Sequence, residues 1–146
     1  MMFVFGNTGC QEKQDNGIAK MHWDRDMCDR CQMAISERKF AVQIIDPLSH
    51  RVYKFDDIGC AVLWLDEEKI PWRDKAIIWI TDAKTGKWLD AKKANYISGA
   101  ITPMAFGFAA YSNETLPKNK TIFMYSSIVK KIEKIKSDNM HKVKEN

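Results

Sequence analysis

The chain of 146 residues lacks a long hydrophobic run. The five apolar residues Met1–Phe5 fall far short of the ~20 that a membrane-spanning helix needs, and they are also short for a signal-peptide core. A strong excess of one charge is missing too, since the net charge is only +4. No interleaved aromatic and basic pattern is present, which argues against nucleic acid binding. With 45% hydrophobic residues, a soluble globular protein of one domain or two very small ones is predicted.

One short stretch, Asp26–Met33, gathers several soft ligand atoms. Cys28 and Cys31 have C-x-x-C spacing, which holds two sulfur atoms close enough to bind one ion. Met33 follows at C-x-M spacing and can add a thioether from the chain just beyond. Thiolates and thioethers suit Cu(I) better than hard cations. The pattern therefore favours a metal site over a chance cysteine pair beside a core methionine.

The beginning of the chain carries a third candidate cysteine. Thr8-Gly9-Cys10, followed by Gln11 and further polar residues, resembles the end of a bacterial lipoprotein signal, in which the cysteine is lipidated. Asn7 departs from that pattern, because such signals usually carry leucine there, and a basic segment before it is missing. Either the start is truncated or Cys10 is a cysteine in a loose tail. Residues 1–22 are predicted to be a signal remnant and flexible tether.

Residues 23–82 are predicted to form a first module that contains the cysteine motif. Alternating apolar residues predict a hairpin over Phe40–Phe55, with a turn at Asp46–Ser49. Asp56 or Asp57 is expected to cap a helix that continues to Leu65. The nearly continuous apolar run Ala76–Ile80 predicts a central strand. A short return strand at Trp88 and a helical turn within Ala91–Tyr96 are expected after it.

The last third of the chain resembles the first at an offset of 70 residues. Val52–Ile58 aligns with Ile122–Ile128, each reading as a short strand, two polar capping residues and an isoleucine that begins a helix. This indicates a duplication and predicts an α+β fold of two small related strand–strand–helix–strand modules packed together. The second module covers residues 83–137, with its helix at Ser127–Ser137. Residues 138–146 are expected to be a disordered tail.

The duplication adds a candidate ligand from the second module. Met104 follows Pro103 at the position that corresponds to Met33, at an offset of 71 residues. If the modules pack about a pseudo-twofold axis, Met104 faces Met33, and the site holds Cys28, Cys31, Met33 and Met104. Such a set favours Cu(I) and adds little for Zn(II), because neutral thioethers do not compensate the charge of a divalent ion. Taken alone, Met104 after the rigid Pro103 is better explained as a core methionine.

Several stretches in combination resemble the NosL family, the copper accessory lipoproteins associated with nitrous oxide reductase. They span roughly Trp23–Ile132 and comprise Cys28-x-x-Cys31-x-Met33, Phe40–Ile45, Tyr53–Cys60, Trp79–Asp82, Thr85-Gly86, Trp88–Ala91 and Thr102–Met104. The four proposed ligands fall on the family's motif positions. The chain departs from the pattern at Asn113–Lys120, where relatives tend to have a full helix.

The resemblance implies a function and a location. The protein would be a Cu(I)-binding metallochaperone, not an enzyme, held as a periplasmic lipoprotein at the outer face of a membrane. Its partner would be a copper-accepting enzyme such as nitrous oxide reductase, or the maturation machinery of that enzyme. Whether a homodimer shares the site is left open by the sequence.

Two other classes of protein use a cysteine pair. Cys28, Cys31 and Cys60 follow the order of a treble-clef zinc module, but His50 sits in the hairpin turn and Leu63 stands where a further ligand is expected. Cys60 is therefore interpreted as a buried helix cysteine. A thiol–disulfide enzyme is disfavoured, because an extended segment follows the motif instead of a helix.

Overall fold

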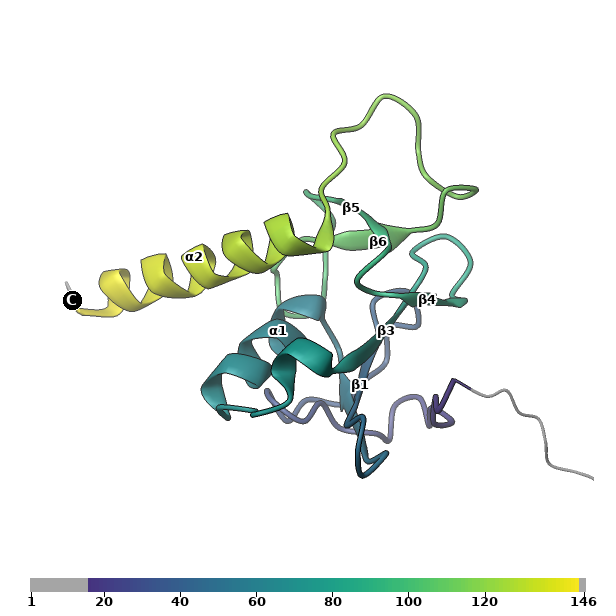
Figure 1. The fold of residues 1–146 in the computed structure, drawn as a ribbon. Coiled ribbons are helices and arrows are strands. Elements are labelled where there is room, and N and C mark those ends of the chain that lie inside the picture. The colour runs from purple at the N-terminus through teal and green to yellow at the C-terminus, as the bar shows by residue number, and fades with distance from the viewer. Residues whose placement is uncertain (1–15, 145–146) are drawn as a thin grey trace, which may run out of the picture.

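The computed structural model describes residues 16–144 as two antiparallel sheets and two α-helices (Figure 1). The predicted α+β class is confirmed. The elements in order are β1 (Val42–Ile45), β2 (Val52–Phe55), α1 (Ile58–Glu67), the short 3-10 helix η1 (Arg73–Lys75), β3 (Ile77–Thr81), β4 (Trp88–Asp90), β5 (Asn95–Ile97), β6 (Ala109–Tyr111) and α2 (Tyr125–Lys144).

The first sheet has the strand order β2-β1-β3-β4, and β1 is its buried centre. Val42 pairs with Phe55 on one side and with Ile80 on the other. The predicted hairpin and central strand are both present, because alternating or continuous apolar runs pair where they can bury a face. The turn between β1 and β2 is held by the Asp46 carboxylate, which accepts the Leu48 amide at 2.8 Å.

Part of the predicted tether packs on this sheet. The buried Gln43 side chain accepts the Ala19 amide at 2.8 Å and donates to the Ala19 carbonyl at 2.8 Å. Met21 is buried beside it. The expectation of a flexible segment is wrong for these residues, because a buried amide side chain needs partners and the chain before the cysteine motif supplies them. Residues 1–15, including Cys10, lie outside the described residues.

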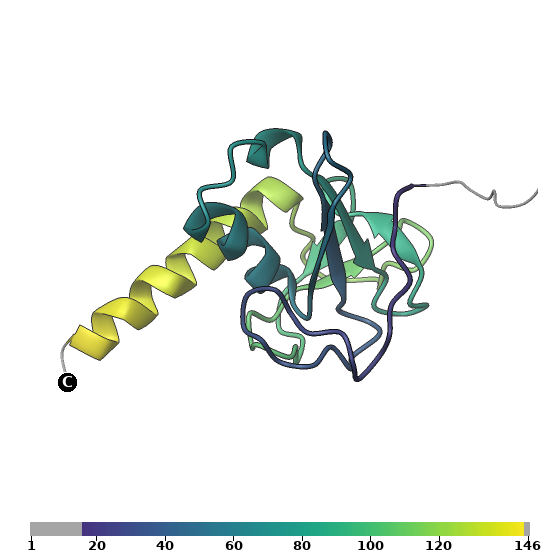
Figure 2. The same cartoon turned by 90° about the horizontal axis from the view of Figure 1, so that it is seen from below.

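Helix α1 crosses the first sheet and carries eight consecutive buried residues, Ile58–Leu65. Asp57 is its N-cap, and its carboxylate accepts the Gly59 amide at 3.1 Å, as the sequence predicted. Trp64 packs on Tyr53 of β2, with ring centroids 4.5 Å apart. The helix is buried all round because the sheet covers one side and α2 covers another (Figure 2).

The second sheet differs from the predicted copy of the first. Tyr96 of β5 pairs with Ala110 of β6 and bridges to Phe123 on its other side. The bridging residue Phe123 is therefore separated from β6 by β5, whereas β1 and β2 pair directly. The predicted helical turn at Ala91–Tyr96 is wrong at its end, because the buried Tyr96 side chain and its two pairing partners favour a strand there.

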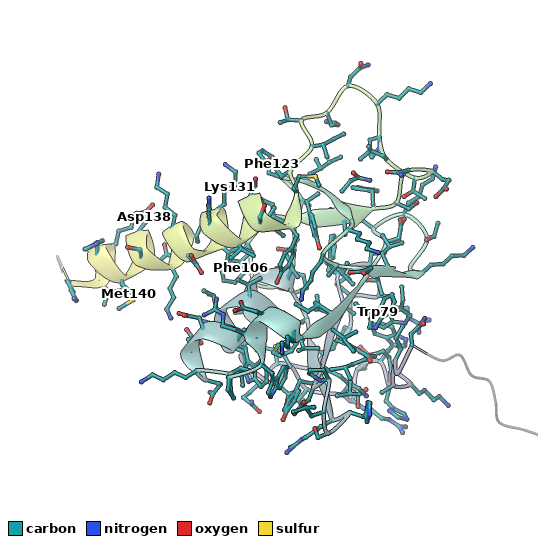
Figure 3. All side chains as sticks on the ribbon, viewed as in Figure 1. Trp79, Phe106, Phe123, Lys131, Asp138 and Met140 are labelled. Carbon is teal, nitrogen blue, oxygen red and sulfur yellow. The ribbon has the colours of Figure 1, made fainter. Side chains whose placement is uncertain are left out.

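Helix α2 continues to Lys144, so the predicted disordered tail is wrong for residues 138–144. Ile128 and Ile132 bury the first half of the helix against the body of the protein. The second half projects away from it and carries Asp138 and Met140 (Figures 1 and 3). Basic residues in the last turn favour helix at this end, since they oppose the partial negative charge of the helix C-terminus. Within residues 16–144, neither helix has both the length and the apolar character needed to cross a bilayer.

Candidate metal centre

Three thiols and one carboxylate converge between the cysteine motif and the beginning of α1. One ligand atom each from Cys28, Cys31, Asp56 and Cys60 lies within 4.8 Å of every other. Cys28, Cys60 and Asp56 are buried, while Cys31 is partly exposed. Thiolate and carboxylate groups at this separation form a donor set that can hold a metal ion.

The cysteine motif is shaped by a tight turn. The Cys28 amide donates to the Met33 carbonyl at 2.8 Å, and the Gln32 amide donates to the Cys28 carbonyl at 3.0 Å. Gln32 has a positive φ of 63°, which lets the chain turn back after Cys31. Together with the Cys60 thiol, the backbone N–H groups of Arg30, Cys31 and Asp56 favour the thiolate form of Cys28 and lower its pKa. The site therefore stabilises a thiolate before any metal arrives.

Strand β2 fixes this turn beside α1. The Asp29 amide donates to the Lys54 carbonyl at 2.8 Å, and the Lys54 amide donates to the Asp29 carboxylate at 2.7 Å. Because β2 leads directly into α1, the same anchor brings Asp56 and Cys60 to the motif. Cys60 lies in the first turn of α1, where the partial positive charge of the helix N-terminus favours anionic groups.

The four groups interact directly. Cys31 donates to one oxygen of Asp56, with Sγ and Oδ2 3.2 Å apart. The other oxygen, Oδ1, is buried and has no hydrogen-bond partner among residues 16–144. A buried carboxylate oxygen without a partner is costly, and a bound cation is one way to satisfy it.

The thiols have divergent acidities because they share one negative charge. A hydrogen bond from Cys60, opposed by burial and aided by backbone N–H groups, lowers the pKa of Cys28 to about 6. Burial raises the pKa of Cys31 to about 12. The bond to the Cys28 thiolate, followed by burial, raises the pKa of Cys60. At neutral pH the metal-free cluster therefore holds a Cys28 thiolate and two thiols that must release protons to bind a metal.

Arg30 connects the cluster to both helices. Its Nη1 lies 3.8 Å from the Cys60 sulfur, and its other guanidinium nitrogens form a bidentate pair with Glu67 of α1 at 2.7 and 3.0 Å. Lys136 of α2 contacts the same carboxylate at 2.6 Å. The guanidinium thereby places a fixed positive charge beside the thiols.

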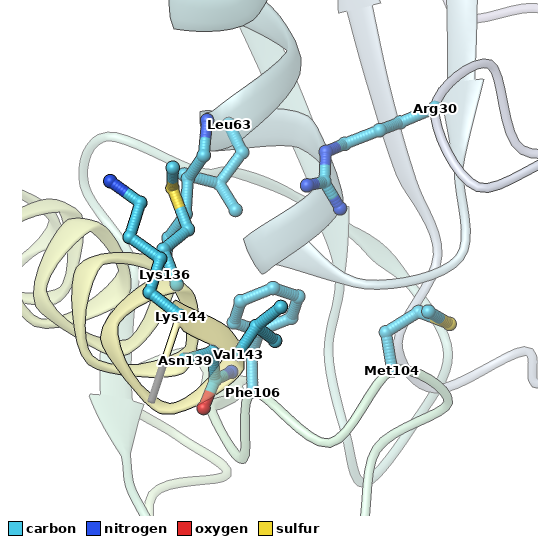
Figure 4. Close-up of a pocket in the computed structure, with 9 residues that line it drawn as sticks. Arg30, Leu63, Met104, Phe106, Lys136, Asn139, Val143 and Lys144 are labelled. Carbon is cyan, nitrogen blue, oxygen red and sulfur yellow. The ribbon is translucent and has the colours of Figure 1, made fainter. Parts of the chain in front are cut away.

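The two methionines predicted as ligands lie at the edge of this region. Met33 is 58% exposed. The Met104 amide donates to the N-cap carboxylate of Asp57 at 3.0 Å. Its side chain lines a groove of about 530 Å³ between α1 and α2, together with Arg30 and Phe106 (Figure 4). Their part in metal binding stays a prediction.

Sequence analysis assigned Cys60 to the core and missed its contact with the cluster. The interpretation of Cys60 as buried is correct, but its thiol faces the motif cysteines. Asp56 was considered only as a helix cap, a role that Asp57 takes. The available signal was the order strand, Asp56, capped helix, Cys60, which places both side chains at one helix N-terminus. His50 lies exposed in the β1–β2 turn, and the structure does not bring it to this cluster.

Comparison with known proteins supports the fold. No protein-family model matches the chain, and no curated protein matches it by sequence. A solved structure, the copper chaperone NosL from Shewanella denitrificans, superposes with a TM-score of 0.59 at 14% sequence identity. The match covers 77% of this chain and 96% of that one. The protein thus has a NosL-like α+β fold. That neighbour is described as a chaperone, which agrees coarsely with a protein that is not an enzyme.

Proposed function

We propose that the protein is a Cu(I) metallochaperone that delivers copper for the assembly of a copper enzyme such as nitrous oxide reductase. The observation that carries this proposal is the convergence of the thiols of Cys28, Cys31 and Cys60 at one point of a NosL-like fold. Sulfur donors favour a soft monovalent ion, and the positions of Met33 and Met104 allow thioethers to contribute.

The uneven burial of the thiols suits transfer of the ion. Cys28 is buried and the pKa of its thiol is lowered, so it is the ligand that retains the metal. Cys31 is partly exposed and Met33 lies on the surface two residues later. Cu(I) accepts two to four soft ligands, so a thiol of the acceptor can join before the donor's weaker ligands leave. Copper is then handed over without being released into water.

Titration of the reduced full-length protein with Cu(I), in competition with a chromogenic Cu(I) chelator, tests the proposal. We expect tight binding that Cys28→Ser or Cys31→Ser abolishes, and that Met33→Ala or Met104→Ala weakens without altering the circular dichroism spectrum. Met124→Ala is the matched methionine control and should leave binding unchanged, because Met124 is exposed just before α2 and does not line the groove that holds Met104. Cu(I) binding that survives loss of both motif cysteines would refute the proposal.

We also propose that the protein acts outside the cytoplasm, anchored through a lipid on Cys10. The sequence around Cys10 and the resemblance to copper accessory lipoproteins support this. Mass spectrometry of the protein from native membranes should detect a diacylglyceryl group on Cys10. An unmodified protein recovered wholly from the cytosol would contradict it.

A further inference from the structure

The acidic group of the cluster is not needed by a Cu(I) site. Asp56 is only 2% exposed and brings a carboxylate oxygen within 4.8 Å of the three sulfurs, and its Oδ1 is unpartnered among residues 16–144. Cu(I) prefers soft donors and gains little from a carboxylate. Zn(II), by contrast, binds cysteine sulfur and aspartate oxygen readily, and usually takes four ligands.

The charge of the cluster also favours Zn(II) over Cu(I). When all four groups are deprotonated, the cluster carries four negative charges in a buried place, and Arg30 supplies one positive charge beside it. A monovalent ion leaves a larger uncompensated charge than a divalent ion does. Because uncompensated buried charge is costly, the complete set of four ligands favours a divalent ion.

We infer that Cys28, Cys31, Cys60 and Asp56 form a four-coordinate Zn(II) site, in which Asp56 is the fourth ligand and the methionines take no part. Zn–S bonds of about 2.3 Å in a tetrahedron place the sulfurs about 3.8 Å apart. All ligand atoms already lie within 4.8 Å of one another, so closure around the ion needs shifts of about 1 Å or less. The inference rests on the proposed function only in that both ions use the thiols of this cluster.

This site differs from the treble-clef zinc module that was considered from the sequence. Its fourth ligand is Asp56 and not His50, which lies in the β1–β2 turn. The fold does not depend on the ion either, because the cluster borders a hydrophobic core that runs from β1 through α1 to Ile128 and Ile132 of α2. Removal of zinc is therefore expected to leave the circular dichroism spectrum unchanged. The two ions would compete for the thiols while using different additional ligands.

The test compares metal affinities of the reduced full-length protein and its variants. Zn(II) is titrated against a chromophoric zinc chelator, and Cu(I) against its own chelator. Asp56→Asn keeps the shape and hydrogen-bonding oxygen but removes the charge, and we expect it to weaken Zn(II) binding by at least roughly 10–100-fold. Cu(I) affinity should change by less than about threefold, because a carboxylate adds little to that ion. Asp46→Asn is the matched control, since Asp46 accepts a backbone amide in the β1–β2 turn, outside the cluster, and Met33→Ala should leave Zn(II) affinity unchanged.

Co(II) provides a measurement on the wild-type protein that does not depend on a variant's folding. A tetrahedral site with three thiolates should give an intense d–d spectrum and a strong sulfur-to-cobalt charge-transfer band. Cys60→Ala should reduce that band by about a third, the share of one thiolate among three.

The outcomes separate this inference from the proposed function. Zn(II) affinity equal in wild type and Asp56→Asn, or a wild-type Co(II) spectrum without tetrahedral character, would overturn the zinc site and leave the copper proposal standing. Zn(II) binding that requires Asp56, in a protein that fails to bind Cu(I), would support the zinc site and remove the copper proposal. Unfolding on zinc removal would overturn the inference of a site added to an independent fold.

Discussion

A methyl group added at Gly59 tests how the beginning of α1 packs against the loop that carries Met104. Gly59 lies in the first turn of α1, directly before Cys60. A Cβ placed there would lie 2.0 Å from Cγ and 2.1 Å from Cδ2 of the Phe106 ring. Carbon atoms in contact stay about 3.5–4.0 Å apart, so the ring and the loop that carries it must move. Gly59→Ala therefore overpacks the junction between α1 and residues 104–106.

Two opposing contributions set how much Gly59→Ala changes the free energy of unfolding. Overpacking typically costs about 1–3 kcal/mol. Alanine in a helix is favoured over glycine by roughly 0.5–1 kcal/mol, since it loses less backbone freedom on folding. We expect Gly59→Ala to destabilise the protein by about 1–2 kcal/mol after both terms are counted. In a Phe106→Ala background the clash is absent, so the same change should stabilise by about 0.5–1 kcal/mol.

The change of sign is measured by urea unfolding of the wild type, the two single variants and the double variant. Unfolding is monitored by circular dichroism under reducing conditions. The coupling between the two positions should be about 2 kcal/mol, within the range seen for residues in contact. Equal destabilisation by Gly59→Ala in both backgrounds would refute the reasoning, because the ring would then not be the group that the methyl displaces.

Three further outcomes follow from the contacts described above. Apparent Cu(I) affinity should rise with pH by about two orders of magnitude per unit above pH 6, since Cys31 and Cys60, both with a raised pKa, must each lose a proton. It should fall more steeply below pH 6, where Cys28 also becomes protonated. A pH-independent affinity would contradict the lowered pKa of Cys28, about 6, and the raised pKa values of the other two thiols. Glu67→Gln should destabilise by only about 1 kcal/mol in urea, because its pairs with Arg30 and Lys136 are partly exposed. Loss of most of that destabilisation in an Arg30→Gln background would identify the Arg30 pair as its main source. Asp82→Ala should lower the free energy of unfolding by about 3 kcal/mol. The buried carboxylate joins the two sheets, because it accepts hydrogen bonds from the Lys84, Thr85 and Ser112 amides and from the Thr115 hydroxyl. A thermal midpoint equal to that of the wild type would contradict this role.

Local patterns in the sequence were sufficient for the elements whose stability is local. The alternation in Phe40–Phe55 predicted β1 and β2, and the apolar run before Thr81 predicted β3, because side-chain period and burial act within a few residues. Asp57 was recognised as a possible cap for the same reason. Where partners distant in sequence decide the structure, the predictions failed. Tyr96 is in a strand because Ala110 and Phe123 pair with it.

The residues of the candidate site also fall into those that local sequence patterns predict and those that they do not. Cys28 and Cys31 could be found from the sequence by themselves, because their spacing brings the sulfurs together in one turn. Asp56 and Cys60 could not, because they join the cluster only through the pairing of Asp29 with Lys54, which sets the cysteine turn against the beginning of α1. The sequence by itself determined that two thiols lie together in one turn. Tertiary structure alone decided that a third thiol and a carboxylate complete it, since their proximity depends on backbone pairing that no local pattern encodes.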